Sequence, residues 1–594
     1  MAKTLNDSQL LQLASDPRAR LFPPLRGATV FGPIVVLTGL IPCLAAVLGA
    51  ELTDRESGWA LRALDLTTAV EVQDWLEPGR NGLARGLIHQ PPLSSWLLAL
   101  LAPDLGAEQL SSWRVLSVSM SCCAIWAMYL LGRRIGGASF GLIVALALCG
   151  HPVMLRLATG TGPAALGMVL IALTVWGFLG HLEGPAQLVS TRMLAGAVAW
   201  GLALLSVGPV AVVLFIPMLV TASSLNQGQS LDSRLQSHAR LEQLWLGLRT
   251  LVVFLFTALS FSGWWQLMML ANHGGDFWHS WWTGQVAWNT LPDPFHSVWR
   301  NWLSQNSFLC GWLVLGLFSI LKELANPSSE LVRRRCQFLL LWWLAALFTR
   351  IMFDIPGLRP STLIDAWDAM FLLPTSLLVA WGVRSAVLRQ AELGGEALLV
   401  VATLGLCVWR MSHSASAGFV AFIAASIALA LLPAIAVRVR RGARRWTERD
   451  WRRLMRVAMI VILAGHLVAG IVELPQPSLE SQSLTELRKR IEPVPALPRV
   501  TLMTMTTEVP ESLLFLLRSR WPKSQFVVAD SREGRSSRET TSVAPDEELV
   551  IEWTRHGMRI TTELSVDRQA TAVGEPVRFR GRRLRIYRVG PRQR

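Results

Sequence analysis

The chain has 594 residues, of which 52% are hydrophobic and only 16% are charged. Soluble domains carry about 25% charged residues, so this composition excludes an ordinary soluble protein and indicates an integral membrane protein. Basic residues exceed acidic ones by 15. The arginines cluster between apolar stretches, which is typical of charge that sets membrane topology, and no nucleic-acid partner is expected.

The membrane domain is predicted to cover residues 28–473. The first apolar stretch, Ala28 to Ala50, follows a polar segment, 1–27, that shows no cleavable signal. A helix needs ~20 residues to span a bilayer, and about thirteen apolar stretches approach this length. The stretch from Met193 to Ala222 must break near Gly208-Pro209 to give two short spans. Their centres lie near residues 39, 122, 145, 171, 200, 216, 260, 314, 344, 377, 403, 427 and 464.

The arginine clusters test this topology. If segment 1–27 is cytoplasmic, alternation of the spans places every dense cluster on the cytoplasmic side, as the positive-inside rule requires. The clusters are Arg133-Arg134, Arg192, 234–249, 333–335, 384–389 and 438–456. The plasma (inner) membrane is the expected location, with outward loops at 51–110, 272–306 and 351–367.

The region 474–594 differs in character from the rest and is predicted to be a soluble extracytoplasmic α/β domain. Its alternating and amphipathic patterns predict a helix over 510–520 and several strands. The predicted strands are 499–507, 524–529, 549–554, 559–566 and 583–589. No catalytic motif is recognised in this region.

The cysteines argue against a disulfide framework or a cysteine-based zinc site. All seven lie in or beside apolar stretches, and no Cys-x-x-Cys or Cys/His ligand spacing occurs. No metal-binding residues and no cofactor are therefore predicted, while assistance by a divalent metal stays open.

Two carboxylates, Asp54 and Glu56, directly follow the first apolar stretch. Asp54 has a structural interpretation as the N-cap of a helix beginning near Ser57. It also has a functional interpretation, because a carboxylate at a water–membrane boundary can act as a general base. Both interpretations remain open on the loop alone.

Further motifs follow in order along the chain. Asp74-Trp75-Leu76-x-Pro78 and Gln90-Pro91-Pro92-Leu93-x-x-Trp96 lie in the first outward loop. Later in the chain come Tyr129-Leu-Leu-Gly-Arg-Arg134, Arg156, Gly201 to Pro209 and Phe371-Leu-Leu-Pro374. Together with the carboxylates, these motifs resemble the GT-C glycosyltransferases that use a polyprenyl phosphate sugar, in particular the protein mannosyltransferase and lipid A aminoarabinose transferase families. The resemblance covers about residues 28–386.

The resemblance implies a mainly α polytopic GT-C fold and transfer of a sugar from a polyprenyl phosphate to a glycan, lipid or protein acceptor. Asp54 or Glu56 would be the catalytic base, with Asp54 preferred. The implied substrate-binding residues are Arg85, His89, Gln90, Arg156, Arg300 and Arg359, with Arg156, His89 and Arg359 as the phosphate clamp.

Departures from the family pattern fall on charged positions. Gln90 and Val207 stand where the family has lysines, and the aspartate that follows the arginine at Arg156 is missing. Two alternatives therefore stay open. One is an inactive relative that acts as a scaffold for envelope assembly. The other is a transporter, which the clustering of charges at span ends argues against.

Overall fold

A computed structural model describes residues 54–223, 236–283, 309–353 and 364–388, with short gaps, and separate elements between 487 and 589. The predicted spans near 39, 403, 427 and 464 lie outside these residues. The chain forms two compact units. The membrane unit comprises Met1–Leu44, Ser117–Ala158 and Pro163–Leu474, and the loop unit comprises Ala45–Leu116, Thr159–Gly162 and Pro475–Arg594.

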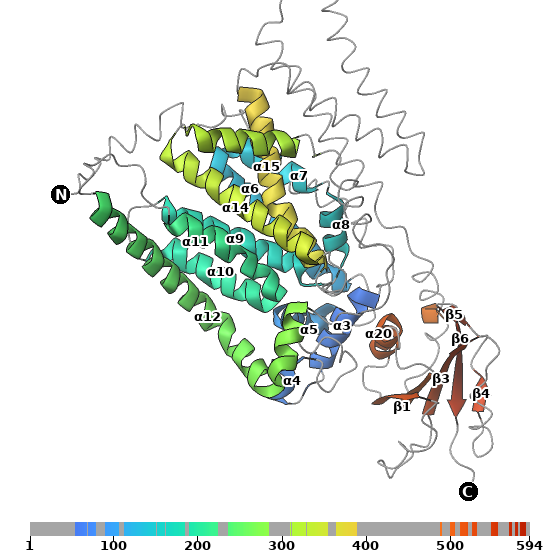
Figure 1. Cartoon of the computed structure of the whole chain (residues 1–594). Coiled ribbons are helices and arrows are strands. Elements are labelled where there is room, and N and C mark those ends of the chain that lie inside the picture. Colours follow the sequence, from blue (N-terminus) through green and yellow to red (C-terminus); the bar gives the residue numbers. More distant parts are fainter. Residues whose placement is uncertain are drawn as a thin grey trace, which may run out of the picture. The chain divides into compact units, whose positions relative to one another are not determined.

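The membrane unit is a bundle of helices (Figure 1). In the described part of the chain, five helices are long and apolar enough to cross a membrane: Trp113–Gly136, Ala164–His181, Thr191–Ala222, Gly247–Trp278 and Ala366–Ser385. The predicted centres from 122 to 377 all fall in helices, so a multi-pass membrane protein is confirmed. The elements are α6 (Ser112–Gly136), α7 (Ala138–Cys149), α8 (Pro152–Thr159), α9 (Ala164–Leu182), α10 (Thr191–Val207), α11 (Phe215–Ser223), α12 (Gln236–Thr283), α14 (Glu330–Phe353), α15 (Ile364–Leu388) and a helix over 312–325.

The break expected at Gly208-Pro209 is present. Helix α10 ends at Val207, Gly208 adopts φ 59°, and a 3-10 helix, η2 (Gly208–Leu214), leads into α11. Trp200 Nε1 donates a hydrogen bond to the carbonyl oxygen of Ala211 at 2.8 Å. In an uninterrupted helix these residues would be about 16 Å apart along the axis, so the chain folds back after Gly208.

Glycines allow several helices to approach backbone to backbone. A Cβ added to Gly382 of α15 would clash with the carbonyl oxygen of Trp312, and one added to Gly316 would clash with that of Leu378. Gly177 of α9 and Gly196 of α10 form a second close crossing. Membrane helices lack a hydrophobic force between them and gain stability from such close packing.

One carboxylate joins three helix ends. Glu183, which caps α9, accepts from Arg134 Nε of α6 at 2.9 Å and from Arg335 Nε of α14 at 2.8 Å. Arg335 also donates to the carbonyl oxygen of Ile135. The arginine clusters at 133–134 and 333–335 therefore lie at the same end of the bundle, as the alternation of spans predicts.

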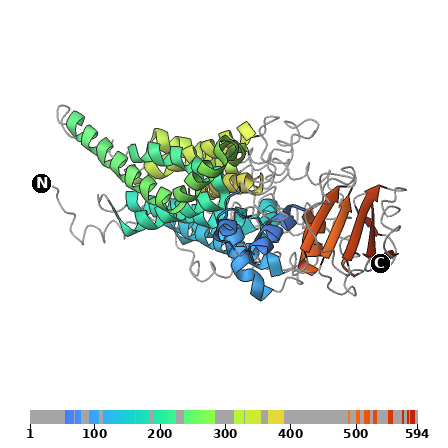
Figure 2. The same ribbon diagram turned by 90° about the horizontal axis from the view of Figure 1, so that it is seen from below.

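Among its described residues, the loop unit contains three helices of the loop between the first two predicted spans and a six-stranded mixed sheet (Figure 2). The helices are α3 (Asp54–Thr67), α4 (Val72–Leu76) and α5 (Leu93–Leu105). The strand order is β2-β1-β3-β6-β4, with β5 paired to β6. The strands are β1 (Arg499–Thr504), β2 (Gln525–Asp530), β3 (Glu548–Arg555), β4 (Ala570–Ala572), β5 (Val577–Phe579) and β6 (Arg582–Val589).

Four predicted strands coincide with β1, β2, β3 and β6. Strands β4 and β5 were not predicted, and the predicted strand 559–566 lies outside the described residues. Strands β1, β2 and β3 run parallel, and β6 is antiparallel to β3. The buried side chains of Val500 and Ile551 come from β1 and β3. Helix α20 (Glu511–Arg520) buries Leu513 and Leu517 and packs against α3. The 474–594 region thus contacts the helix that begins at Asp54.

Candidate functional site

The two predicted carboxylates lie in the first turn of α3. The helix begins at Asp54, so the expectation of a start near Ser57 is wrong by three residues, and Asp54 is already helical. Acidic residues in the first turn complement the partial positive charge of a helix N-terminus, which supports this earlier start. Asp54 and Glu56 therefore share one helix end in the loop unit.

Arg62, two turns further along α3, joins this helix to the other motifs of the first loop. Its Nε donates to the carbonyl oxygen of Pro78 at 3.0 Å, and its Nη2 donates to that of Gln90 at 2.7 Å. Its Nη1 lies 3.4 Å from the carbonyl oxygen of Pro91. The guanidinium also lies 5.7 Å from the ring centre of Trp59, in a cation–π contact. One side chain thus holds three motif-bearing segments together.

The sequence interpretation missed Arg62. Its side chain is fully buried, and burial lowers the pKa of Arg62 to about 9. The group stays charged at neutral pH, and a buried charge is tolerated only where hydrogen bonds replace water. The signal that could have found it is one arginine among the apolar residues of α3, whose neighbours Leu61 and Ala63 are also buried.

Two further contacts complete this arrangement. Trp96 Nε1, at the end of the Pro-Pro-Leu motif, donates to the carbonyl oxygen of Trp75 at 2.6 Å. Gly162, in the loop after α8, lies against α3, because a Cβ there would be 3.7 Å from Trp59 Nε1. The segment that follows Arg156 in the chain therefore reaches the helix of Asp54 and Glu56.

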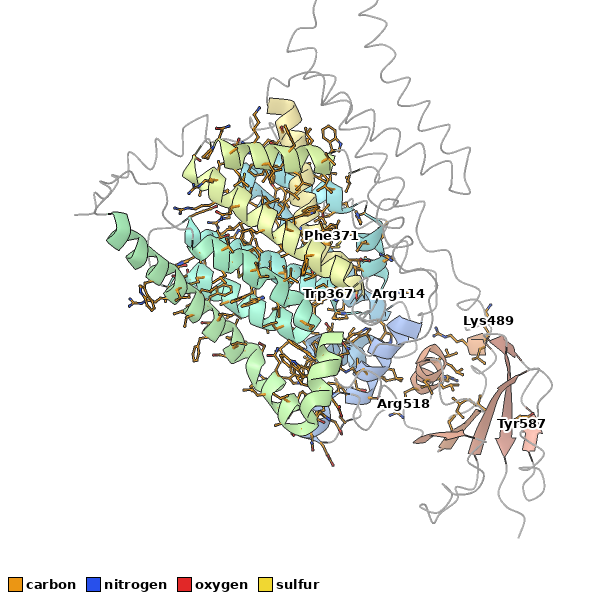
Figure 3. The ribbon with its side chains drawn as sticks, viewed as in Figure 1. Arg114, Trp367, Phe371, Lys489, Arg518 and Tyr587 are labelled. Carbon is orange, nitrogen blue, oxygen red and sulfur yellow. The ribbon has the colours of Figure 1, made fainter. Side chains whose placement is uncertain are left out.

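Arg156 of α8 is the predicted phosphate clamp, and the structure gives it a protein partner. Its Nη2 lies 3.2 Å from Oδ2 of Asp368 on α15. Trp367, the residue before Asp368, and Phe371 are buried on α15 (Figure 3), and Phe371 packs on Trp343 at 5.9 Å between ring centres. The aspartate of the ion pair thus follows a buried tryptophan in the chain.

The positions that depart from the family pattern are buried. Gln90 is 2% exposed and Val207 is 1% exposed. Val207 packs against Gly167 of α9, and its neighbour Ser206 donates to the carbonyl oxygen of Pro163. Neither position presents a cation. The remaining predicted residues, Arg85, His89, Arg300 and Arg359, lie outside the described residues, as do the side chains of Asp54 and Glu56.

Within the part of the chain that the structure describes, no group of three His, Cys, Asp or Glu side chains is placed to hold a metal ion.

Comparison with known proteins supports the fold. Residues 89–264 match the family model described as dolichyl-phosphate-mannose-protein mannosyltransferase. The structure of ArnT from Cupriavidus metallidurans bound to undecaprenyl phosphate is similar, with a TM-score of 0.58 and 15% identity over 95% of this chain and 98% of that one. The apo structure of ArnT gives a TM-score of 0.55 and 16% identity with the same coverage. No curated protein sequence matches. The GT-C fold expected from the motifs is confirmed.

Proposed function

We propose that this GT-C-fold membrane protein transfers a sugar from a polyprenyl phosphate carrier to an envelope acceptor on the outer face of the plasma membrane. The acceptor is a lipid, a polysaccharide or a protein. The match of residues 89–264 to a family named for a dolichyl phosphate sugar supports a donor of this class. The ArnT structure that holds undecaprenyl phosphate supports the same class of carrier.

The observation that carries this proposal is the contact between Arg62 and the carbonyl oxygens of Gln90 and Pro91. It joins the helix of Asp54 and Glu56 to the Pro-Pro-Leu segment. The chain therefore keeps the motifs of the resemblance as one assembled loop. Such a loop can place a carboxylate beside the segment that carries His89 and Gln90, which are proposed to bind the donor.

The chemistry divides between two kinds of group. Asp54, or Glu56 in the alternative register, accepts the proton of the acceptor hydroxyl or amine as the new glycosidic bond forms. Arginines stabilise the negative charge on the departing phosphate, and Arg156 is the clamp residue with His89 and Arg359. Arg85, Gln90 and Arg300 complete the proposed donor site.

The proposal is tested by transfer of labelled sugar. Purified protein is incubated with polyprenyl phosphate sugars and a membrane fraction, and label in lipid, glycan and protein is measured. We expect transfer by the wild-type protein and about 10²–10⁴-fold slower transfer by Asp54→Asn. Absence of transfer from every polyprenyl phosphate sugar, with protein that is folded, would overturn the proposal.

A second candidate is an inactive relative that acts as a scaffold in envelope assembly. Two observations favour it: the buried Gln90 and Val207 supply no cation where the family has lysines, and Arg156 is paired with Asp368. A scaffold would bind partner proteins equally well in the wild type and in Asp54→Asn. The transfer assay separates the two candidates directly.

A further inference from the structure

The ion pair between Arg156 and Asp368 joins two helices that are far apart in the sequence. Arg156 is on α8 and Asp368 is on α15, and the Nη2–Oδ2 distance is 3.2 Å. The arginine side chain is 43% exposed and the aspartate side chain is 12% exposed. The carboxylate is therefore held in the protein, while the guanidinium remains accessible to a second anion.

A phosphate and a carboxylate compete for such a guanidinium. The planar group offers five N–H donors, and both anions bind it through charge-assisted hydrogen bonds. A carboxylate already in contact fixes the direction of the guanidinium plane and offsets part of its charge. Removal of that carboxylate charge should therefore strengthen the attraction between the guanidinium and a phosphate.

The sequence pattern makes Asp368 unexpected. The resemblance has an aspartate shortly after the arginine at Arg156, and this chain lacks it. The structure supplies a carboxylate to Arg156 from α15 instead. This position is not part of any motif in the sequence.

We infer that Asp368 is a positioning residue for the phosphate of the donor, acting through Arg156. It holds the guanidinium in an ion pair and limits the affinity of the site for polyprenyl phosphate, which favours release of that product after transfer. This inference rests on the proposed function, because it assumes that Arg156 meets a phosphate.

The test measures binding of undecaprenyl phosphate to the full-length protein in detergent. Asp368→Asn keeps the shape of the side chain and removes its charge. Because pairs exposed to solvent contribute little, we expect binding about two- to fivefold tighter than in the wild type. Asp368→Glu should restore wild-type affinity. Uncharged undecaprenol should bind equally to all variants, since it has no phosphate.

A double-mutant cycle separates a positioning role from a general effect of charge. In an Arg156→Gln background, Asp368→Asn should leave undecaprenyl phosphate affinity unchanged, because the partner through which Asp368 acts is gone. The same gain with and without Arg156, or no gain in the single variant, would overturn the inference and leave the proposed function intact. A wild-type protein that binds the phosphate no better than undecaprenol would overturn both.

Discussion

Arg62 Nη2 donates a hydrogen bond to the carbonyl oxygen of Gln90 at 2.7 Å. This contact joins a helix that begins at Asp54 to the segment that leads into α5. The arginine is fully buried, so the interaction is made in a low-dielectric environment where a charged donor is worth more than at the surface. Arg62 is therefore a central contact of the first loop, together with the hydrogen bond from Trp96 to Trp75.

Replacement of this side chain should destabilise the loop unit. Hydrogen bonds to charged groups contribute about 1.5–3 kcal/mol each, and Arg62→Met removes the donor for two short ones, to Pro78 and Gln90. Relief of the desolvation cost of the guanidinium offsets part of this, so we expect a net loss of about 3 kcal/mol. A lower Tm of the detergent-purified protein measures it.

Arg249→Met is the matched control, because Arg249 is exposed on α12 beside Trp245 and should be replaced with little effect on the Tm. An Arg62→Met variant as stable as the wild type would mean that the carbonyl oxygens of Pro78 and Gln90 find other donors. That result would rule out the proposed role of Arg62 in holding the loop together.

The carboxylate at the end of α9 should be similarly important in the membrane unit. Glu183→Gln removes the negative charge that joins Arg134 to Arg335. These two arginine side chains are only 15% and 13% exposed. Removing one partner of a largely buried ion pair costs about 3–5 kcal/mol. We expect a reduced yield of folded protein and a lower Tm. Glu71→Gln, at an exposed carboxylate with no side-chain cap bond, should have neither effect.

The glycine crossing between α15 and the helix over 312–325 gives a steric prediction. Gly382→Val would place a branched side chain against the carbonyl oxygen of Trp312, so the two helices must separate. We expect this variant to aggregate on extraction. Gly263→Ala on α12 is the control, because its nearest contact would be an ordinary 3.6 Å from Leu259. Normal gel-filtration behaviour of Gly382→Val would rule out the close crossing.

Sequence reasoning predicts the helices well and the contacts between them poorly. The break at Gly208 could be predicted because proline and glycine interrupt a helix locally. The partnership of Arg156 with Asp368 could not, because it depends on how α8 and α15 pack in space. Arg62 stands out only as an arginine between apolar residues, and its partners could not be predicted, because backbone carbonyl oxygens are carried by every residue.

The orientation of the chain in the membrane gives another prediction. Helix α20 packs against α3, within the same compact unit as the first loop. If that loop faces outward, the 474–594 region must face outward with it. Alkaline phosphatase fused after Arg594 should be active, because it folds only outside the cytoplasm. An inactive phosphatase fusion, together with bright fluorescence from a fluorescent protein fused at the same position, would contradict the proposed topology.

The two carboxylates of α3 give the most direct prediction about catalysis. Asp54 and Glu56 occupy the first turn of the helix, where an acidic side chain stabilises the helix by about 0.3–1 kcal/mol. If this is their only role, Asp54→Asn and Glu56→Gln should lower stability slightly and leave transfer unchanged. If Asp54 is the general base, Asp54→Asn cannot accept the proton of the acceptor, and the rate of sugar transfer should fall by about 10²–10⁴.

The two substitutions also decide the register of the resemblance. When Glu56 is aligned with the family glutamate, Arg55 falls on the family aspartate, and Asp54 is interpreted as that aspartate displaced by one residue. Because the family's base is the aspartate, we expect Asp54→Asn to abolish most transfer and Glu56→Gln to reduce it less. The reverse order of effects would assign the base to Glu56. Thermal unfolding of both variants provides the control, since each should melt within a few degrees of the wild type. Transfer from a polyprenyl phosphate sugar that survives both substitutions would show that the catalytic carboxylate lies elsewhere in the chain.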